Sequence, residues 1–164
     1  MNAIHAEMTS YLNKEVVAAH ELIDILQEEQ NRLLSASIDE LEPLVAQKAA
    51  LVAQLTQHTR GRHECLKKAG FEANLAGMNA WIENGKDQPD TISIEKNWGE
   101  LVSLTQSAKE LNRLNGMLIS SHMARNQQAL SILHSNSQPN AGMYGPDGQP
   151  SRLAATPVRS VITG

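Results

Sequence analysis

The side chains that could carry chemistry in this sequence are six histidines and one cysteine. Imidazole and thiolate are common zinc ligands, so a metal site is the first possibility to consider. His58, His63 and Cys65 lie close together, but spacings of five and two residues place them on different faces of a helix. The chain has neither two histidines four residues apart nor a Glu-x-x-His motif, which di-metal sites in helical bundles use. We therefore predict helix-surface histidines and no metal.

Other catalytic chemistry also finds no support in the sequence. Cys65 has no nucleophile motif beside it, and a single cysteine cannot form an intramolecular disulfide, which fits a reducing cytosol. We find no Gly-rich phosphate loop and no acid–base pair. The net charge of −4 gives no general attraction to nucleic acid. The prediction is a protein that is not an enzyme, needs no cofactor and binds no nucleic acid.

The more informative pattern lies at Leu111–Leu133, LNRLNGMLISSHMARNQQALSIL, which has no acidic residue. On a helix, its apolar side chains cover an arc roughly 240° wide, whereas about 100° suffices for a helix packed on one neighbour. Asn112, Asn115 and Asn126 lie on one flank of the arc, and buried amides need hydrogen-bond partners. Two interpretations are equally open: a fully buried core helix, or a surface that binds a second protein.

The elements that position this stretch are predicted to be helices. Leu, Ala, Gln, Glu and Lys dominate, and only five aromatic residues occur. Residues 1–42 carry a net charge of −7, residues 43–110 of zero and residues 111–164 of +3. The acidic first helix and basic last helix either pack together or are solvated independently. No run of residues approaches a membrane span, and the N-terminus does not resemble a secretory signal.

Helices are expected at about 2–35, 39–69, 72–84 and 94–134. The first two form an antiparallel hairpin, because only a short connection joins them. The first helix shows the coiled-coil spacing Leu12, Val16, Ala19, Ile23, Leu26, Gln30 and Leu33. The second continues it with Leu41, Leu44/Val45, Lys48, Leu51/Val52, Leu55, His58 or Thr59, Arg62 and Leu66.

The helix ends have recognisable signals. Ser37 and Glu40 have capping-box spacing, with Asp39 as an alternative cap, and Gly70 fits the position after the second helix. Ser93 is a plausible N-cap of the last helix. The short helix carries a stripe of Phe71, Leu75, Met78 and Ile82, with Trp81 beside it, and is expected to cover the open end of the hairpin. The last helix begins with the stripe Ile94, Trp98, Leu101, Leu104 and Ala108.

Residues 136–164 contain four of the six prolines and are predicted to form a disordered tail that follows a helical domain at 1–135. Tyr144 beside Gly145-Pro146-Asp147-Gly148 is either a partner-binding anchor or a solvated side chain, and composition alone favours the latter. The fold class is therefore all-α: a coiled-coil-like three-helix bundle with a short extra helix and a tail.

Three blocks of the C-terminal third resemble the FlgN-type flagellar export chaperones. They are Asn112-x-x-Asn115-Gly116-x-Leu118-Ile119, then Arg125-Asn126-Gln127-Gln128-Ala129-Leu130 with Leu133, then Tyr144-Gly145-x-Asp147-Gly148-Gln149. The hairpin and long third helix fit the same family along almost the whole chain, whereas the helix with Phe71 and Trp81 is not part of the resemblance.

The resemblance implies a cytosolic type III export chaperone for the hook–filament junction proteins FlgK and FlgL, whose C-terminal amphipathic helices it would hold unpolymerised. It also implies that the tail tyrosine docks the complex on the export gate, FlhA. The expected gate-docking residues are Tyr144, Gly145, Asp147 and Gly148. The expected substrate-binding residues are Leu111, Leu114, Asn115, Gly116, Met117, Leu118, Ile119, Met123, Asn126, Ala129, Leu130 and Leu133.

Two other classes remain open. In a constitutive structural coiled coil, or an adaptor without an export role, the wide apolar arc would be buried permanently in a homo-oligomer. A bundle enzyme is the third class, which the missing ligand spacing disfavours.

Overall fold

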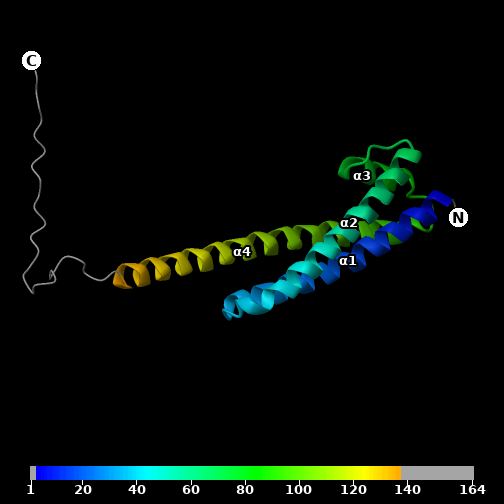
Figure 1. Cartoon of the computed structure of the whole chain (residues 1–164). Helices are drawn as coiled ribbons and strands as arrows, with labels where there is room; N and C mark the ends of the chain where they lie inside the picture. Colours follow the sequence, from blue (N-terminus) through cyan, green and yellow to red (C-terminus); the bar gives the residue numbers. More distant parts are fainter. Residues whose placement is uncertain (1–2, 138–164) are drawn as a thin grey trace, which may run out of the picture. The chain divides into compact units, whose positions relative to one another are not determined.

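The computed structural model describes residues 3–137, which form helices and no strand. In chain order these are α1 (Ala3–Leu34), a 3-10 turn η1 (Ile38–Glu40), α2 (Leu41–Lys68), α3 (Leu75–Asn84) and α4 (Thr91–Ser137), and Figure 1 labels the four α-helices. The chain divides into two compact units, Met1–Ser121 and His122–Gly164. The predicted all-α class is confirmed. The predicted tail lies outside the described residues, except that residues 136–137 continue α4.

Two ion pairs with buried carboxylates connect α1 and α2 in one antiparallel register. Arg62 Nε donates to Glu15 Oε2 at 2.7 Å, and Lys48 Nζ donates to Glu29 Oε1 at 2.7 Å. Glu29 lies 14 residues after Glu15, and Lys48 lies 14 residues before Arg62, so both pairs fit the same antiparallel alignment. A one-residue slip would leave two carboxylates buried without cations, which costs several kcal/mol each. The pairs therefore specify how the hairpin aligns.

The seam of α1, meaning the line of residues that faces the other helices, differs from the predicted one at every second position. Leu12, Ala19, Leu26 and Leu33 are buried as predicted, but Val16, Ile23 and Gln30 are only half-buried. Their places in the seam are taken by Glu15, Leu22 and Glu29. The prediction left out Glu15 and Glu29 because carboxylates are rarely buried unless they are paired. The α2 seam was predicted with Lys48 and Arg62 in it, and these two side chains provide the pairing.

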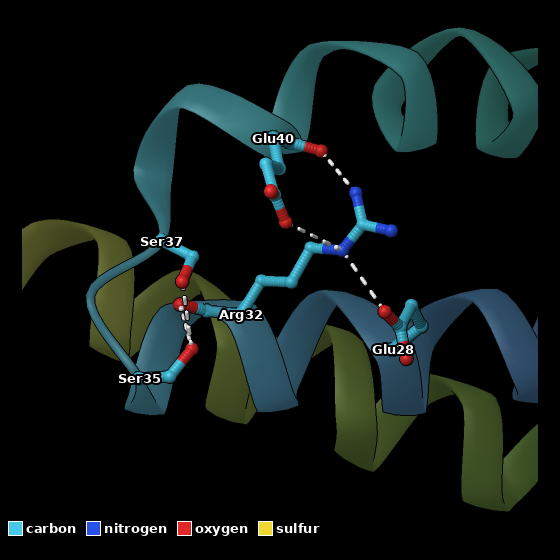
Figure 2. A network of polar contacts seen from close by, with 5 residues as sticks. All are labelled: Glu28, Arg32, Ser35, Ser37 and Glu40. Carbon is cyan, nitrogen blue, oxygen red and sulfur yellow. Dashed lines mark hydrogen bonds and ion pairs between the residues drawn. The ribbon is translucent and has the colours of Figure 1, made fainter.

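The capping box that was predicted at the start of the second helix does not form. The Ser37 and Ser35 hydroxyls lie 3.1 Å apart, and Ser37 makes no side-chain cap for the following turn (Figure 2). Glu40 instead faces Arg32, whose guanidinium donates to Glu28 Oε1 at 2.9 Å and to the Glu40 carbonyl. α2 begins at Leu41, and Asp39 lies in the turn before it.

Backbone hydrogen bonds of the Schellman type close both helices of the hairpin. Ser37 N donates to Arg32 O at the end of α1, and Phe71 N donates to Leu66 O at the end of α2. The left-handed residue in the second case is Gly70, at φ 84°, as predicted. In the first case it is Ala36, at φ 57°, which carries a Cβ in a conformation that favours glycine.

A first core cluster joins all four helices where α1 begins and α2 ends. Met8 and Leu66 meet Met78, Trp81 and Ile94 there, so α3 covers this end of the hairpin, as predicted. In addition, the Arg62 guanidinium lies 4.8 Å from the Trp98 ring centre, and Trp98 Nε1 donates to Asn79 Oδ1 at 2.8 Å. These contacts connect α2, α4 and α3.

The starts of the two later helices differ from the prediction. α3 starts at Leu75 rather than residue 72, because the Asn74 side chain accepts a hydrogen bond from Gly77 N at 2.7 Å. Leu75 was predicted in the apolar stripe but is exposed. α4 starts at Thr91, whose hydroxyl donates to Gly85 O, and Ser93 lies inside the helix rather than capping it.

Within the first unit, α4 runs parallel to α1. Asn97 donates to Asn13, Glu100 pairs with His20 at 2.7 Å, and Asn115 reaches α1 further along. The predicted stripe of α4 is confirmed, with Ile94 and Leu101 buried and Trp98, Leu104 and Ala108 half-buried. No helix in residues 3–137 is long and apolar enough to cross a membrane.

Candidate protein-binding surface

One side of the predicted binding stretch is used inside the first unit. Leu111 packs against a second core cluster of Ala18, Leu22, Leu26 and Leu51. Leu114 and Leu118 are half-buried. Spacings of three and four residues put these leucines on one face of α4. Part of the wide apolar arc is therefore explained by packing within the chain.

Asn115 belongs to this inner side, although it was predicted at a partner surface. Its side chain is 1% exposed, and Nδ2 donates to Leu26 O at 2.9 Å and to Glu29 Oε2 at 2.8 Å. Lys48 reaches the other oxygen of Glu29, so three helices meet in one buried polar network. The side chain of Asn115 is not available to a partner in this packing. Buried amides are a known means of fixing helix register.

The other side of the stretch is open. In the first unit, Gly116, Met117 and Ile119 are exposed, with Met117 at 59% and Ile119 at 37%. Neither side chain belongs to the two core clusters that the described residues form. The inner leucines and the outer Met117 and Ile119 together account for the excess width of the arc.

The described helical part of the second unit, residues 122–137, contains no buried residue. Its predicted binding residues are Met123, Asn126, Ala129, Leu130 and Leu133, and all five are exposed. Leu130 is 65% exposed, and Ile132, which was not among the predicted residues, is exposed as well. A run of large apolar side chains without cover is typical of a surface that binds another protein.

A groove of about 1080 Å³ in the first unit was not predicted. Its walls are α2 and α4, and its floor is α1. Ala19, Leu22 and Leu26 form the floor, Val45 and Val52 lie on the α2 wall, and Leu104 and Ala108 lie on the α4 wall. The sequence feature that could have indicated the groove is the occurrence of two adjacent apolar residues at two places in α2, Leu44-Val45 and Leu51-Val52. The structure buries each leucine in the hairpin and leaves each valine in the groove.

The charged residues that line the groove are mostly cationic. Lys48, Arg60, Lys67 and Lys109 are accompanied by one carboxylate, Glu64. Lys48 pairs with Glu29 and Lys67 with Glu64. In the part of the chain that the structure describes, Arg60 and Lys109 have no ion pair. The groove is therefore positive although the chain as a whole is acidic.

The histidines and the cysteine of the described residues do not gather into one site. No group of three or more His, Cys, Asp or Glu side chains in residues 3–137 could hold a metal ion. Burial, and then the Arg62 charge, lower the pKa of His63, so this groove-lining imidazole is neutral near pH 7. Burial, and then a hydrogen bond to Glu7, raise the pKa of Cys65 to about 11, so its thiolate is scarce at neutral pH.

The predicted gate-docking residues Tyr144, Gly145, Asp147 and Gly148 lie outside the described residues. The sequence left open whether the acidic first helix and the basic last helix pack together through their charges. The ion pair of Arg113 is with Glu110 on α4 itself, at 2.7 Å. In residues 3–137, the polar contacts between α4 and α1 run through Asn97, Glu100 and Asn115 rather than through an arginine or lysine of the last helix.

Comparison with known proteins gives one consistent family. The sequence model described as "FlgN protein" matches residues 1–152. The flagella synthesis protein FlgN of Proteus mirabilis is 30% identical over 148 residues, covering 89% of this chain and 91% of that protein. The Escherichia coli K12 protein of the same name is 26% identical over 146 residues, covering 88% and 90%.

A solved structure, described as a putative flagella synthesis protein FlgN from Pseudomonas aeruginosa, has the same fold. The TM-score is 0.61 with 23% sequence identity, and the match covers 76% of this chain and 93% of that one.

Proposed function

This chain belongs to the FlgN family of flagella synthesis proteins, and we propose that it is a cytosolic type III export chaperone. Its substrates would be the hook–filament junction proteins FlgK and FlgL. It would bind their C-terminal amphipathic helices, keep them unpolymerised and deliver them to the export gate. The proposal includes no catalytic step and no cofactor.

The observation that carries the proposal is the set of uncovered apolar side chains on α4. Met117 and Ile119 in the first unit, and Met123, Leu130 and Leu133 in the second, are exposed to between 37% and 65%. An amphipathic helix binds such a surface by laying its own apolar face on it. Methionine side chains adapt to different shapes, which suits a surface that accepts two related substrates.

Sequestration would work by mass action. A substrate helix that also forms the contacts of the assembled filament cannot polymerise while it is bound here. The two ion pairs of the α1–α2 hairpin do not involve α4, so substrate binding on α4 would not require them to break. Asn115 is omitted from this binding surface, because its side chain is buried and its Nδ2 donates to Leu26 O and Glu29 Oε2 of α1.

Delivery would depend on residues outside the described part. Tyr144, with Gly145, Asp147 and Gly148, is proposed to dock the loaded chaperone on the cytoplasmic domain of FlhA. A tyrosine brings a large contact area and one hydroxyl at low cost in rotamer entropy.

The alternative is a structural coiled coil that buries the same side chains in a permanent homo-oligomer. Light scattering of the purified chain, followed by co-purification with FlgK or FlgL with and without the C-terminal helix, separates the two. The chaperone proposal expects a chain that captures the junction protein only when that helix is present. A large oligomer that does not change with concentration, and no capture, would support the structural alternative.

A further inference from the structure

The groove between α2 and α4 has the dimensions of a helix-binding site. Its α2 wall runs from Val45 to Lys67, which at 1.5 Å per residue is about 33 Å. A bound helix of roughly 20 residues has that length, and α1 and α4 would line about 12 Å of it, along Ala19 to Leu26 and Leu104 to Asn112. Small residues occur on all three sides, Ala19 on the floor, Ala49 on α2 and Ala108 on α4, and they permit a close approach of another backbone.

The chemistry of the walls limits what can bind. The floor is apolar, Val52 on the wall is 47% exposed, and the rim carries Arg60 and Lys109 without ion pairs among the described residues. A ligand with one apolar face and acidic residues on both flanks would satisfy the floor and the rim together. A basic helix would meet charges of its own sign.

We propose that this groove binds an amphipathic helix with acidic flanks, supplied by the substrate protein. This inference rests on the proposed function and adds a second binding site for the substrate protein, separate from the exposed side chains at residues 117–133 of α4, and the charge of the helix that it accepts.

Two other occupants fit the groove less well. Residues 138–164 of the chain itself contain one acid, Asp147, and two bases, Arg152 and Arg159, so their charge has the same sign as the rim. A second copy has an acidic helix in α1, but the apolar face of α1 is already buried against α2 and α4. Neither offers an acidic helix with a free apolar face.

The test uses the full chain and two synthetic helical peptides of about 20 residues. Both peptides carry the same Leu/Ala face; one has Glu and the other Lys on its flanks. Fluorescence anisotropy is expected to show binding of the Glu peptide that is at least about tenfold tighter than binding of the Lys peptide. The preference should shrink as salt is added, because salt screens exposed charges. Equal affinities for the two peptides would overturn the inference.

Variants locate the binding in the groove. Val52→Asp should reduce affinity for the Glu peptide by about tenfold or more, whereas Ile92→Asp, at an exposed residue of α4 outside the groove, should not. The double variant Arg60→Glu/Lys109→Glu should reverse the peptide preference. All these side chains are exposed, so the variants should keep the helical circular dichroism of the parent. An unchanged preference in the double variant would overturn the inference.

Further measurements separate this inference from the proposed function. If Val52→Asp still captures FlgK as wild type does, the groove inference fails and the chaperone proposal stands. If no junction protein is captured but the Glu peptide still binds the groove, the chaperone proposal fails. A dimer that Val52→Asp converts to a monomer, or tighter peptide binding after deletion of residues 138–164, would identify a second copy or the chain's own end as the occupant and overturn the inference.

Discussion

Replacing Glu15 by leucine should destabilise the hairpin more than any exposed substitution on α1. Glu15 is 1% exposed, and its carboxylate accepts two hydrogen bonds from Arg62, at 2.7 and 3.3 Å, and one from the Thr59 hydroxyl. Removing it leaves the Arg62 guanidinium buried without a counter-charge. Breaking a buried pair in this way typically costs about 3–5 kcal/mol. Because Arg62 keeps its contact with the Trp98 ring, we expect the lower end, about 3 kcal/mol.

The assay is urea unfolding at neutral pH, followed by far-ultraviolet circular dichroism, with thermal unfolding as a second measure. For a chain of this length, about 3 kcal/mol corresponds to a fall in melting temperature of about 6–12 °C. Glu21→Leu is the matched control, since Glu21 is an exposed glutamate of the same helix, and its effect should stay within about 0.5 kcal/mol.

The double variant Glu15→Leu/Arg62→Met tests the reason for the loss. Replacing both charges by apolar side chains removes the unpaired cation, so most of the stability should return, with a coupling energy of at least about 2 kcal/mol. If Glu15→Leu costs less than about 1 kcal/mol, or if the two single effects simply add, the buried pair does not contribute as the structure indicates.

Three further predictions concern other parts of the chain. Ala36→Gly should stabilise the protein by about 0.5–1 kcal/mol in urea unfolding, because it relieves the left-handed φ of 57°, and a loss of stability would contradict this reading of the turn. Cys65 should react with iodoacetamide at about pH 8 more than about a hundredfold slower in the native chain than in urea, because its pKa is about 11; equal rates would contradict its burial. Tyr144→Ala should weaken docking of the substrate-loaded protein on the FlhA cytoplasmic domain by about thirtyfold without changing substrate affinity, and equal dissociation constants for wild type and variant would argue against the anchor.

Residues that obey simple periodicity were predictable from the sequence. Leu12, Leu26 and Leu33 of α1, and Ile94 and Leu101 of α4, are buried where an apolar repeat places them. Gly70 ends α2 as its conformational freedom suggests. These features depend on one helix at a time, so a single sequence contains the information.

Features that depend on two helices were not predictable in the same way. Glu15 and Glu29 occupy seam positions only because Arg62 and Lys48 lie opposite them, which requires the hairpin register to be known first. Asn115 was predicted to bind a partner, because the sequence does not show that Leu26 and Glu29 of α1 accept the hydrogen bonds of its Nδ2. The groove beside Val52 exists because α4 and α2 both pack on α1, a relation between three helices that periodicity does not describe.

The most direct test of the chaperone account is a titration of the C-terminal helical segment of FlgK into three proteins. These are wild type, Leu130→Asp and the control Gln128→Asp, both substitutions being at exposed positions of α4. The account predicts that Leu130→Asp keeps its helical content but binds at least about thirtyfold more weakly, because a carboxylate would be buried in the interface, while Gln128→Asp binds like wild type. Wild-type affinity in Leu130→Asp would contradict the claim that the exposed apolar side chains of α4 bind the substrate.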